Sequence, residues 1–219
     1  MLISYKNKFI FIHNRKVAGE SIVNALKSYG VINPLHSAWL HKLCEGSPFG
    51  QRLNPFISRY VPFIPSFNKH QTAFDVKNNI NPAFWQEAFK FGFVRNPWDL
   101  HVSLYHFISQ SKNNIRHKKV KKLDSFRSYL EWFVKNWMYT QKDFFYFESA
   151  QLVDFIGRFE NLENDFSYVT NTIGIDVSLP FKNVSRHKNY SEYYDTYTKD
   201  FVARHFQEDI ELFGYTFGK

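Results

Sequence analysis

The stretch that decides the fold is Phe9-Ile10-Phe11-Ile12-His13-Asn14-Arg15-Lys16-Val17-Ala18-Gly19-Glu20-Ser21-Ile22. Its apolar beginning predicts a strand over Lys8–His13, and the apolar spacing that follows predicts a helix over Glu20–Tyr29. A polar turn with Lys16 joins the two. Backbone N–H groups and the helix dipole converge on an anion at such a helix start, and a lysine adds a full charge. The stretch therefore predicts a phosphate-binding turn.

A second strand, turn and helix follow later in the chain. Phe89–Val94 reads as a strand, Arg95 and Asn96 as the turn, and a helix starts at Pro97 and reaches about Ser111, with Ser103 on its polar face. Ligands collect at the carboxyl ends of strands in an open α/β sheet, so we expect both turns at one edge. Two phosphate-binding turns predict a ligand with phosphates in two places.

The other predicted elements alternate between strands and helices. Helices are expected over 72–79, 81–88, 123–135, 161–173 and 198–213, and strand-like segments over 144–147 and 153–159. This alternation predicts a three-layer α/β fold in one domain, 1–219. Residues 30–66 are rich in Pro and Gly, and we expect an irregular excursion there that binds the acceptor.

The composition excludes several classes of protein. A chain that is 44% hydrophobic and 20% aromatic is not disordered, and a net charge of +8 favours an anionic partner. Cys44 is the only cysteine, which excludes an intrachain disulfide and a cysteine metal cluster. The sequence has no apolar run near the ~20 residues of a membrane span and no signal-peptide pattern, so we expect a cytoplasmic protein.

The turn at Lys16 does not follow the order of a Walker A loop. Lys16 precedes Gly19, whereas that loop needs Gly followed directly by Lys and Ser or Thr. The chain also lacks a convincing aspartate-bearing strand that would hold Mg²⁺, which phosphoryl transfer from ATP requires. A P-loop nucleotide kinase stays as an alternative, as does a non-catalytic polyanion- or nucleotide-binding protein.

Two motifs together resemble the sulfotransferases, and most closely their carbohydrate-sulfotransferase-like branch. They are Phe-Ile-His-x-x-Lys-x-Ala-Gly-x-Ser-Ile at 11–22 and Phe-Gly-Phe-Val-Arg-Asn-Pro-Trp-Asp-x-x-Val-Ser-x-Tyr at 91–105. The resemblance implies a P-loop-NTPase-like fold with a central parallel sheet flanked by helices. It also implies 3′-phosphoadenosine-5′-phosphosulfate (PAPS) as the sulfuryl donor, with no metal.

The resemblance assigns donor-binding residues to both turns. The 5′-phosphosulfate would lie against Arg15, Lys16, Ala18, Gly19, Glu20, Ser21 and Ile22. The 3′-phosphate would lie against Arg95 and Ser103, and Arg186 falls in a segment that in related enzymes folds over the donor. Glu20 departs from the family pattern, which has a neutral hydroxyl residue there. A carboxylate repels the donor unless it points away or pairs with a cation such as Arg15.

Sulfuryl transfer needs a base for the acceptor hydroxyl and a cation for the bridging oxygen. Lys16 is the candidate cation. His70 is similar in placement to the catalytic histidine of glycan sulfotransferases, while His36, His41 and His106 stay as alternatives.

The acceptor is expected to be a carbohydrate hydroxyl. The basic segment at 112–122 favours an acidic glycan, or else it is an ordinary solvated loop. The chain carries no recognised nucleic-acid motif, and its oligomeric state stays open.

Overall fold

The chain divides into two compact units. The computed structural model describes residues 1–32, 67–180 and 188–218. Unit 1 comprises residues 1–94 and 143–182, and unit 2 comprises residues 95–142 and 183–219. Most of the predicted acceptor excursion and Arg186 lie outside the described residues, as do His36, His41 and Cys44. The expectation of a single domain stays a prediction.

Unit 1 is built on a mixed sheet that has five strands in the described part of the chain, in the order β3-β1-β2-β4-β7. The strands are β1 (Leu2–Ser4), β2 (Phe9–Ile12), β3 (Val31–Ile32), β4 (Phe89–Val94) and β7 (Phe155–Arg158). β2, β4 and β7 run parallel, so the chain leaves β2 and β4 at the same edge, as predicted. β1 pairs antiparallel with β2 and β3, an addition that the sequence did not predict.

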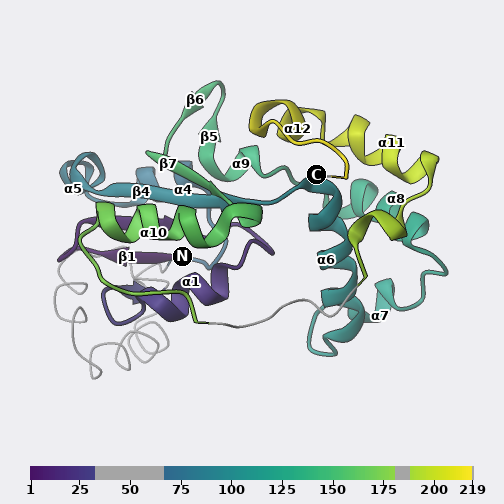
Figure 1. Cartoon of the computed structure of the whole chain (residues 1–219), viewed down its shortest axis with the longest axis horizontal. Helices are drawn as coiled ribbons and strands as arrows, with labels where there is room; N and C mark the ends of the chain where they lie inside the picture. The colour runs from purple at the N-terminus through teal and green to yellow at the C-terminus, as the bar shows by residue number, and fades with distance from the viewer. Residues whose placement is uncertain (33–66, 181–187, 219) are drawn as a thin grey trace. The chain divides into compact units, whose positions relative to one another are not determined.

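The helices of unit 1 cover the sheet. They are α1 (Gly19–Leu26), α4 (Ala73–Asn79), α5 (Pro82–Glu87), α9 (Lys142–Phe145) and α10 (Leu162–Thr172), with the 3-10 turn η1 (Phe159–Asn161) and the small β5 (Tyr146–Phe147) and β6 (Ala150–Gln151) ribbon. Alternate strand residues such as Phe11 and Phe91 are fully buried in one core with α1 and α10, which Figure 1 shows on the same side of the sheet.

The opposite face of the sheet is shaped by Gly92. Strand residues alternate between faces, so Gly92 points away from the α1–α10 core that buries Phe91 and Phe93. A Cβ atom at Gly92 would lie 2.1 Å from Cε1 of Phe145 in α9. The glycine therefore lets an aromatic ring close directly over the centre of β4, and helices cover both faces.

Unit 2 is helical in its described part. Its elements are α6 (Pro97–Gln110), α7 (His117–Val120), α8 (Phe126–Trp137), η2 (Tyr190–Tyr193), α11 (Thr196–His205) and α12 (Gln207–Phe213). The start of α6 agrees with the sequence prediction, because the Asn96 side chain accepts from the Trp98 N–H and Pro97 occupies the first helical position.

Two sequence predictions are wrong. The helix expected over 198–213 is broken at the buried Phe206, and the strand expected at Phe144–Phe147 is partly the helix α9. The second difference follows from Asp209, which is buried in α12 and accepts hydrogen bonds from the N–H groups of Gln141 (2.7 Å) and Lys142 (2.8 Å). A carboxylate at these two donors stabilises a helical start, and strand propensity does not overcome it.

His101 of α6 is buried in the core of unit 2 between aromatic rings. Its ring centroid lies 4.4 Å from that of Phe206 and 4.8 Å from that of Phe133. Neither ring nitrogen has a hydrogen-bond partner among the described residues. Burial lowers the pKa of His101 to about 3, so the ring is neutral in the folded protein at every ordinary pH.

A His101→Phe variant is expected to make unfolding less sensitive to acid. The pKa of His101 is lower in the folded than in the unfolded protein, so its contribution to stability is complete above about pH 6.5 and decreases as pH falls toward 3. At pH 5 the wild type should have lost about 2 kcal/mol that the variant keeps. Urea unfolding at pH 8 and pH 5 measures this. An equal stability difference between the two proteins at both pH values would contradict it.

Candidate active site

The turn between β2 and α1 has an unusual backbone. Lys16 and Ala18 both have a φ of 59°, a left-handed conformation that residues with a side chain rarely adopt. Such alternation turns backbone N–H groups into a concave anion-binding surface, and strain of this kind collects at functional sites. The Asn14 side chain donates to the Phe93 carbonyl (3.1 Å), which ties the turn to β4.

Helix α1 begins directly after this turn. The N–H groups of Ser21 (2.9 Å) and Ile22 (3.1 Å) both donate to the Ala18 carbonyl. The Gly19 and Glu20 N–H groups come before this first intrahelical bond, in the position where helix starts bind anions. The side chain of Ile22 is fully buried, which anchors the helix to the core.

Gly19 is required by its contact with His13. A Cβ atom at Gly19 would lie 1.9 Å from Nε2 of His13. The His13 ring cannot turn away easily, because it is buried, stacks on Phe11 (centroids 5.4 Å apart) and meets His70 edge-on (4.9 Å). Burial lowers its pKa to about 2, so His13 is a neutral packing group beneath the turn.

A Gly19→Ala variant is expected to be destabilised by about 1–3 kcal/mol, because the new methyl group overpacks the His13 ring. The double variant Gly19→Ala/His13→Ala should be more stable than the sum of the two single changes predicts, since the second change makes room for the first. Denaturant unfolding of the wild type and three variants measures the coupling. Strict additivity would show that His13 does not exclude a side chain at position 19.

His70 lies next to the turn and is oriented by it. Its Nδ1 lies 2.8 Å from the His13 carbonyl oxygen. A carbonyl oxygen only accepts hydrogen bonds, so Nδ1 carries the proton and Nε2 presents a lone pair. Burial is the main reason why the pKa of His70 is lowered to about 4, with the cations Arg15 and Lys69 contributing. His70 is therefore neutral and able to accept a proton at neutral pH.

Glu20 points to a cation, but not to the one expected. Its carboxylate forms an ion pair with Lys69, the residue before His70. The sequence suggested a cation such as Arg15 in this role, and Lys69 is a cation that takes it. The contact gives the carboxylate a partner outside the turn.

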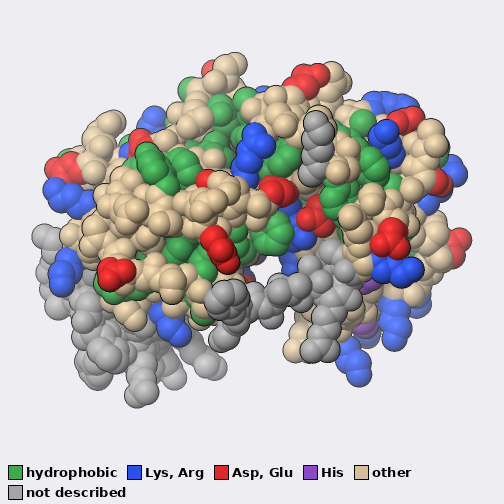
Figure 2. Space-filling model, in the orientation of Figure 1, with side chains coloured by type: hydrophobic (Ala, Val, Ile, Leu, Met, Phe, Trp, Pro, Cys, Tyr) green, Lys and Arg blue, Asp and Glu red, His purple; other side chains and the backbone are tan. Residues whose placement is uncertain are grey.

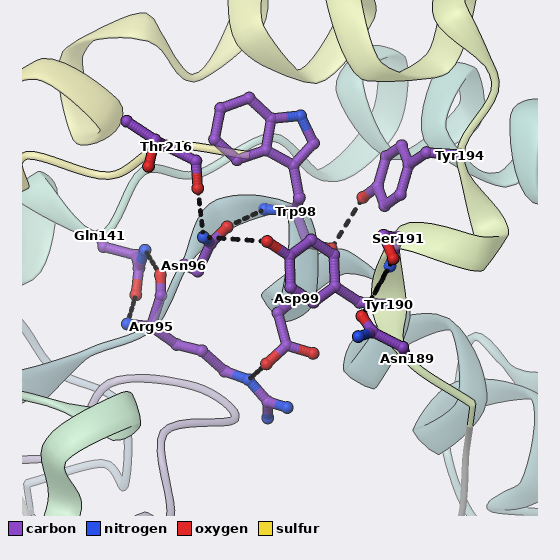
Figure 3. A network of polar contacts seen from close by, with 10 residues as sticks. All are labelled: Arg95, Asn96, Trp98, Asp99, Gln141, Asn189, Tyr190, Ser191, Tyr194 and Thr216. Atoms are coloured by element: carbon purple, nitrogen blue, oxygen red, sulfur yellow. Dashed lines mark hydrogen bonds and ion pairs between the residues drawn. The ribbon is translucent and has the colours of Figure 1, made fainter. Parts of the chain in front are cut away.

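Arg95 opens unit 2 and is held from two sides. Its N–H donates to Gln141 Oε1 (2.9 Å) and its carbonyl accepts from Gln141 Nε2 (2.7 Å). The Nε of its guanidinium donates to Asp99 (2.8 Å), as Figure 3 shows. Ser103 is buried one helical turn beyond Asp99. Arginine presents five N–H donors in a fixed fork, a geometry that suits a phosphate as well as a carboxylate.

Chain comparison identifies the family. The model of the sulfotransferase family matches residues 1–216. The chain belongs to the sulfotransferase family. It is 29% identical over 124 residues to an uncharacterized protein of Archaeoglobus fulgidus, a match that covers 54% of this chain and 95% of that protein.

The fold of this sulfotransferase is similar to a known structure. The crystal structure of mouse sulfotransferase SULT7A1 complexed with PAP aligns with a TM-score of 0.54 at 13% identity, covering 95% of this chain and 86% of that one. The likeness confirms the predicted α/β fold. The family match confirms the predicted enzyme class, a sulfotransferase.

The structure brings some predicted site residues of the sulfotransferase together. Unit 1 joins the turn around Lys16 to His70, and unit 2 places Arg95 close to Asp99. The sequence did not predict the roles of Lys69 and Gln141. Lys69 contacts Glu20 across 49 residues of sequence, and Gln141 contacts Arg95 across 46. The buried packing of His13 makes it a support for the turn.

The described residues were compared with two kinds of site, metal-binding clusters and membrane-spanning helices. Within 1–32, 67–180 and 188–218, no group of three His, Cys, Asp or Glu side chains could hold a metal ion. None of the helices in these ranges combines the length and apolar character needed to cross a bilayer.

Proposed function

We propose that this sulfotransferase moves a sulfuryl group from PAPS to a hydroxyl of a carbohydrate acceptor. The observation that carries the proposal is the strained turn with Lys16 at the start of α1, next to a neutral histidine with an acceptor nitrogen. Family membership supports the reaction, and the related fold of a mouse enzyme crystallised with PAP supports the donor.

The donor would contact both motifs. The 5′-phosphosulfate is assigned to the turn and the first residues of α1, namely Arg15, Lys16, Ala18, Gly19, Glu20, Ser21 and Ile22. Backbone N–H groups carry most of this contact, so the Glu20 side chain can pair with Lys69 without disturbing it. The 3′-phosphate is assigned to Arg95 and Ser103, with Arg186 as a further contact.

The reaction proceeds by in-line displacement. The acceptor hydroxyl oxygen attacks sulfur and its proton passes to Nε2 of His70, while the bond between sulfur and the bridging oxygen breaks. The electron pair of that bond stays on the 5′-phosphate, and the Lys16 ammonium stabilises the growing charge there. Because the sulfuryl group carries only one negative charge, a lysine can take the part that Mg²⁺ takes in phosphoryl transfer.

An acidic carbohydrate is the acceptor that the charge distribution favours. Residues 112–122 contain six Lys or Arg and no Asp or Glu. Lys118, Lys119, Lys121 and Lys122 are all exposed, and blue side chains project from the part of unit 2 that carries α7 in Figure 2. The buried Val120 anchors this turn, so the lysines are presented from a fixed base.

A two-step experiment tests the proposal. Calorimetry with 3′,5′-adenosine bisphosphate comes first, and transfer of ³⁵S from labelled PAPS to a panel of neutral and acidic polysaccharides comes second. We expect nucleotide binding in the absence of added metal, and labelling that is strongest on uronic-acid polymers. Chelator in both steps tests the expectation that no metal is required.

Separate outcomes would contradict separate parts of the proposal. A failure to bind the nucleotide at millimolar concentration would remove the donor assignment. Binding without transfer to any glycan, together with transfer to a small phenol or alcohol, would remove the carbohydrate acceptor. Metal-dependent ATP turnover would instead favour a nucleotide kinase.

A further inference from the structure

The ion pair between Glu20 and Lys69 connects two parts of the proposed site. Glu20 lies in the first turn of α1, directly after the phosphate-binding turn, and Lys69 immediately precedes His70. Both side chains are largely exposed, 63% for Glu20 and 42% for Lys69, so the pair is a modest tie. The pair therefore ties the helix that would receive the donor to the segment that carries the proposed base.

The segment around His70 is held by several other contacts: Phe67 is buried, and the His70 ring meets the His13 ring edge-on, with centroids 4.9 Å apart. The Lys69 carbonyl accepts from the Met1 nitrogen (2.9 Å), and the Asn68 N–H donates to Gln71 Oε1 (2.7 Å) within the segment itself. Helix α4 follows, fixed by a capping box in which Thr72 and Asp75 exchange hydrogen bonds. The Glu20–Lys69 pair joins this segment to α1 by side chains.

We propose that Glu20 is a positioning residue, whose ion pair with Lys69 holds His70 Nδ1 on the His13 carbonyl and so leaves Nε2 as the proton acceptor. The proposal rests on the proposed function for its catalytic meaning. It explains a carboxylate in a turn that binds anions: the negative charge is directed to Lys69 and stabilises the position of the base. In this proposal the Glu20 backbone N–H faces the donor, while the Glu20 side chain contacts neither the acceptor nor the transferred group.

The tautomer of His70 reports whether its ring stays at the His13 carbonyl. A neutral imidazole carries one proton on either nitrogen, and the hydrogen bond of one nitrogen decides which form prevails. The His13 carbonyl selects the Nδ1–H form of His70. If the segment moves away from α1, this bond is lost and the Nε2–H form gains, which blocks the nitrogen that would accept the proton.

Nitrogen NMR of ¹⁵N-histidine-labelled protein, without donor or acceptor, tests the proposal directly. In Glu20→Gln the ratio of the Nδ1–H to the Nε2–H form of His70 should fall about two- to fivefold, the range expected from a partly exposed ion pair. The matched control is Glu87→Gln, which removes the similarly exposed pair with Lys8 (2.9 Å) in the same unit. That variant should leave the ratio unchanged.

The charge-swapped variant Glu20→Lys/Lys69→Glu provides the rescue. It should restore the ratio, because the pair reforms with its charges exchanged. In turnover assays, Glu20→Gln should lower kcat by about the same two- to fivefold without weakening nucleotide binding.

The outcomes distinguish this inference from the proposed function. An unchanged tautomer ratio in Glu20→Gln, or an equal change in Glu87→Gln, overturns the positioning role even if the protein transfers sulfate. A ratio that falls in Glu20→Gln and returns in the swapped variant supports it, even if every acceptor fails and the proposed function has to be abandoned.

Discussion

A Lys16→Met variant is expected to transfer sulfate about 10²- to 10³-fold more slowly than the wild type, the loss typical of removing one charge-stabilising donor. Methionine keeps an unbranched side chain of nearly the same length and an L-residue at the left-handed position, so the turn retains the same backbone conformation. The change removes only the positive charge that we place at the bridging oxygen. The loss should therefore appear mainly in kcat, because the ground state carries less charge on that oxygen than the transition state.

Initial rates with labelled PAPS, combined with calorimetry of 3′,5′-adenosine bisphosphate, separate the two effects. The control is Lys77→Met, which neutralises an exposed lysine of α4 in the same unit. An equal loss in both variants would indicate a general effect of net charge. A Lys16→Met enzyme with unaltered kcat would remove Lys16 from the mechanism.

A His70→Gln variant is expected to lose about 10²- to 10⁴-fold in kcat, the contribution typical of a general base. Glutamine can still hydrogen-bond to the His13 carbonyl, so the segment should stay in place while the proton acceptor is lost. Far-ultraviolet circular dichroism and the unfolding midpoint should match the wild type. A variant with near wild-type turnover would leave the base to another group, such as His106, among the alternatives that the structure describes.

The role of His70 as a base also predicts how the rate changes with pH. Burial lowers the pKa of His70 to about 4, and a base works only when it is unprotonated. In the wild type, kcat/KM should therefore hold at pH 6 and fall as pH decreases through about 4. Arg15 and Lys69 contribute to lowering the pKa of His70 in the free enzyme. A bound anionic donor offsets their positive charge, so the pKa of His70 should be higher in the complex. The acid limb of kcat should lie at higher pH than that of kcat/KM, and His70→Gln should lack both limbs.

Much of the fold could be predicted from local sequence patterns. β4 spans Phe89–Val94 as predicted, and α6 begins at Pro97 as predicted, because the information for both lies in neighbouring residues. Gly174 and Gly214 follow α10 and α12 with φ values of 67° and 62°, and glycine at such a helix end is likewise a local preference. These features can therefore be predicted from the neighbouring sequence.

Features that depend on distant partners could not be read in this way. β1 is a three-residue strand whose register with Phe9–Phe11 comes from pairing. The helical start at Gln141 depends on Asp209, 68 residues away. In the candidate site, the Lys16 turn follows from its own residues, whereas the partner of Glu20 does not. The sequence does not distinguish Lys69 from the other lysines, and only the folded structure shows that it lies beside α1.

The contact between His13 and Gly19 has a consequence for how this family diverges. A methyl group at position 19 has no space while a ring stands at position 13. The residues at positions 13 and 19 are therefore sterically coupled. A larger residue at position 19 requires a smaller side chain at position 13. Of the two orders of substitution in this chain, the one that first places a small residue at 13 avoids an overpacked intermediate.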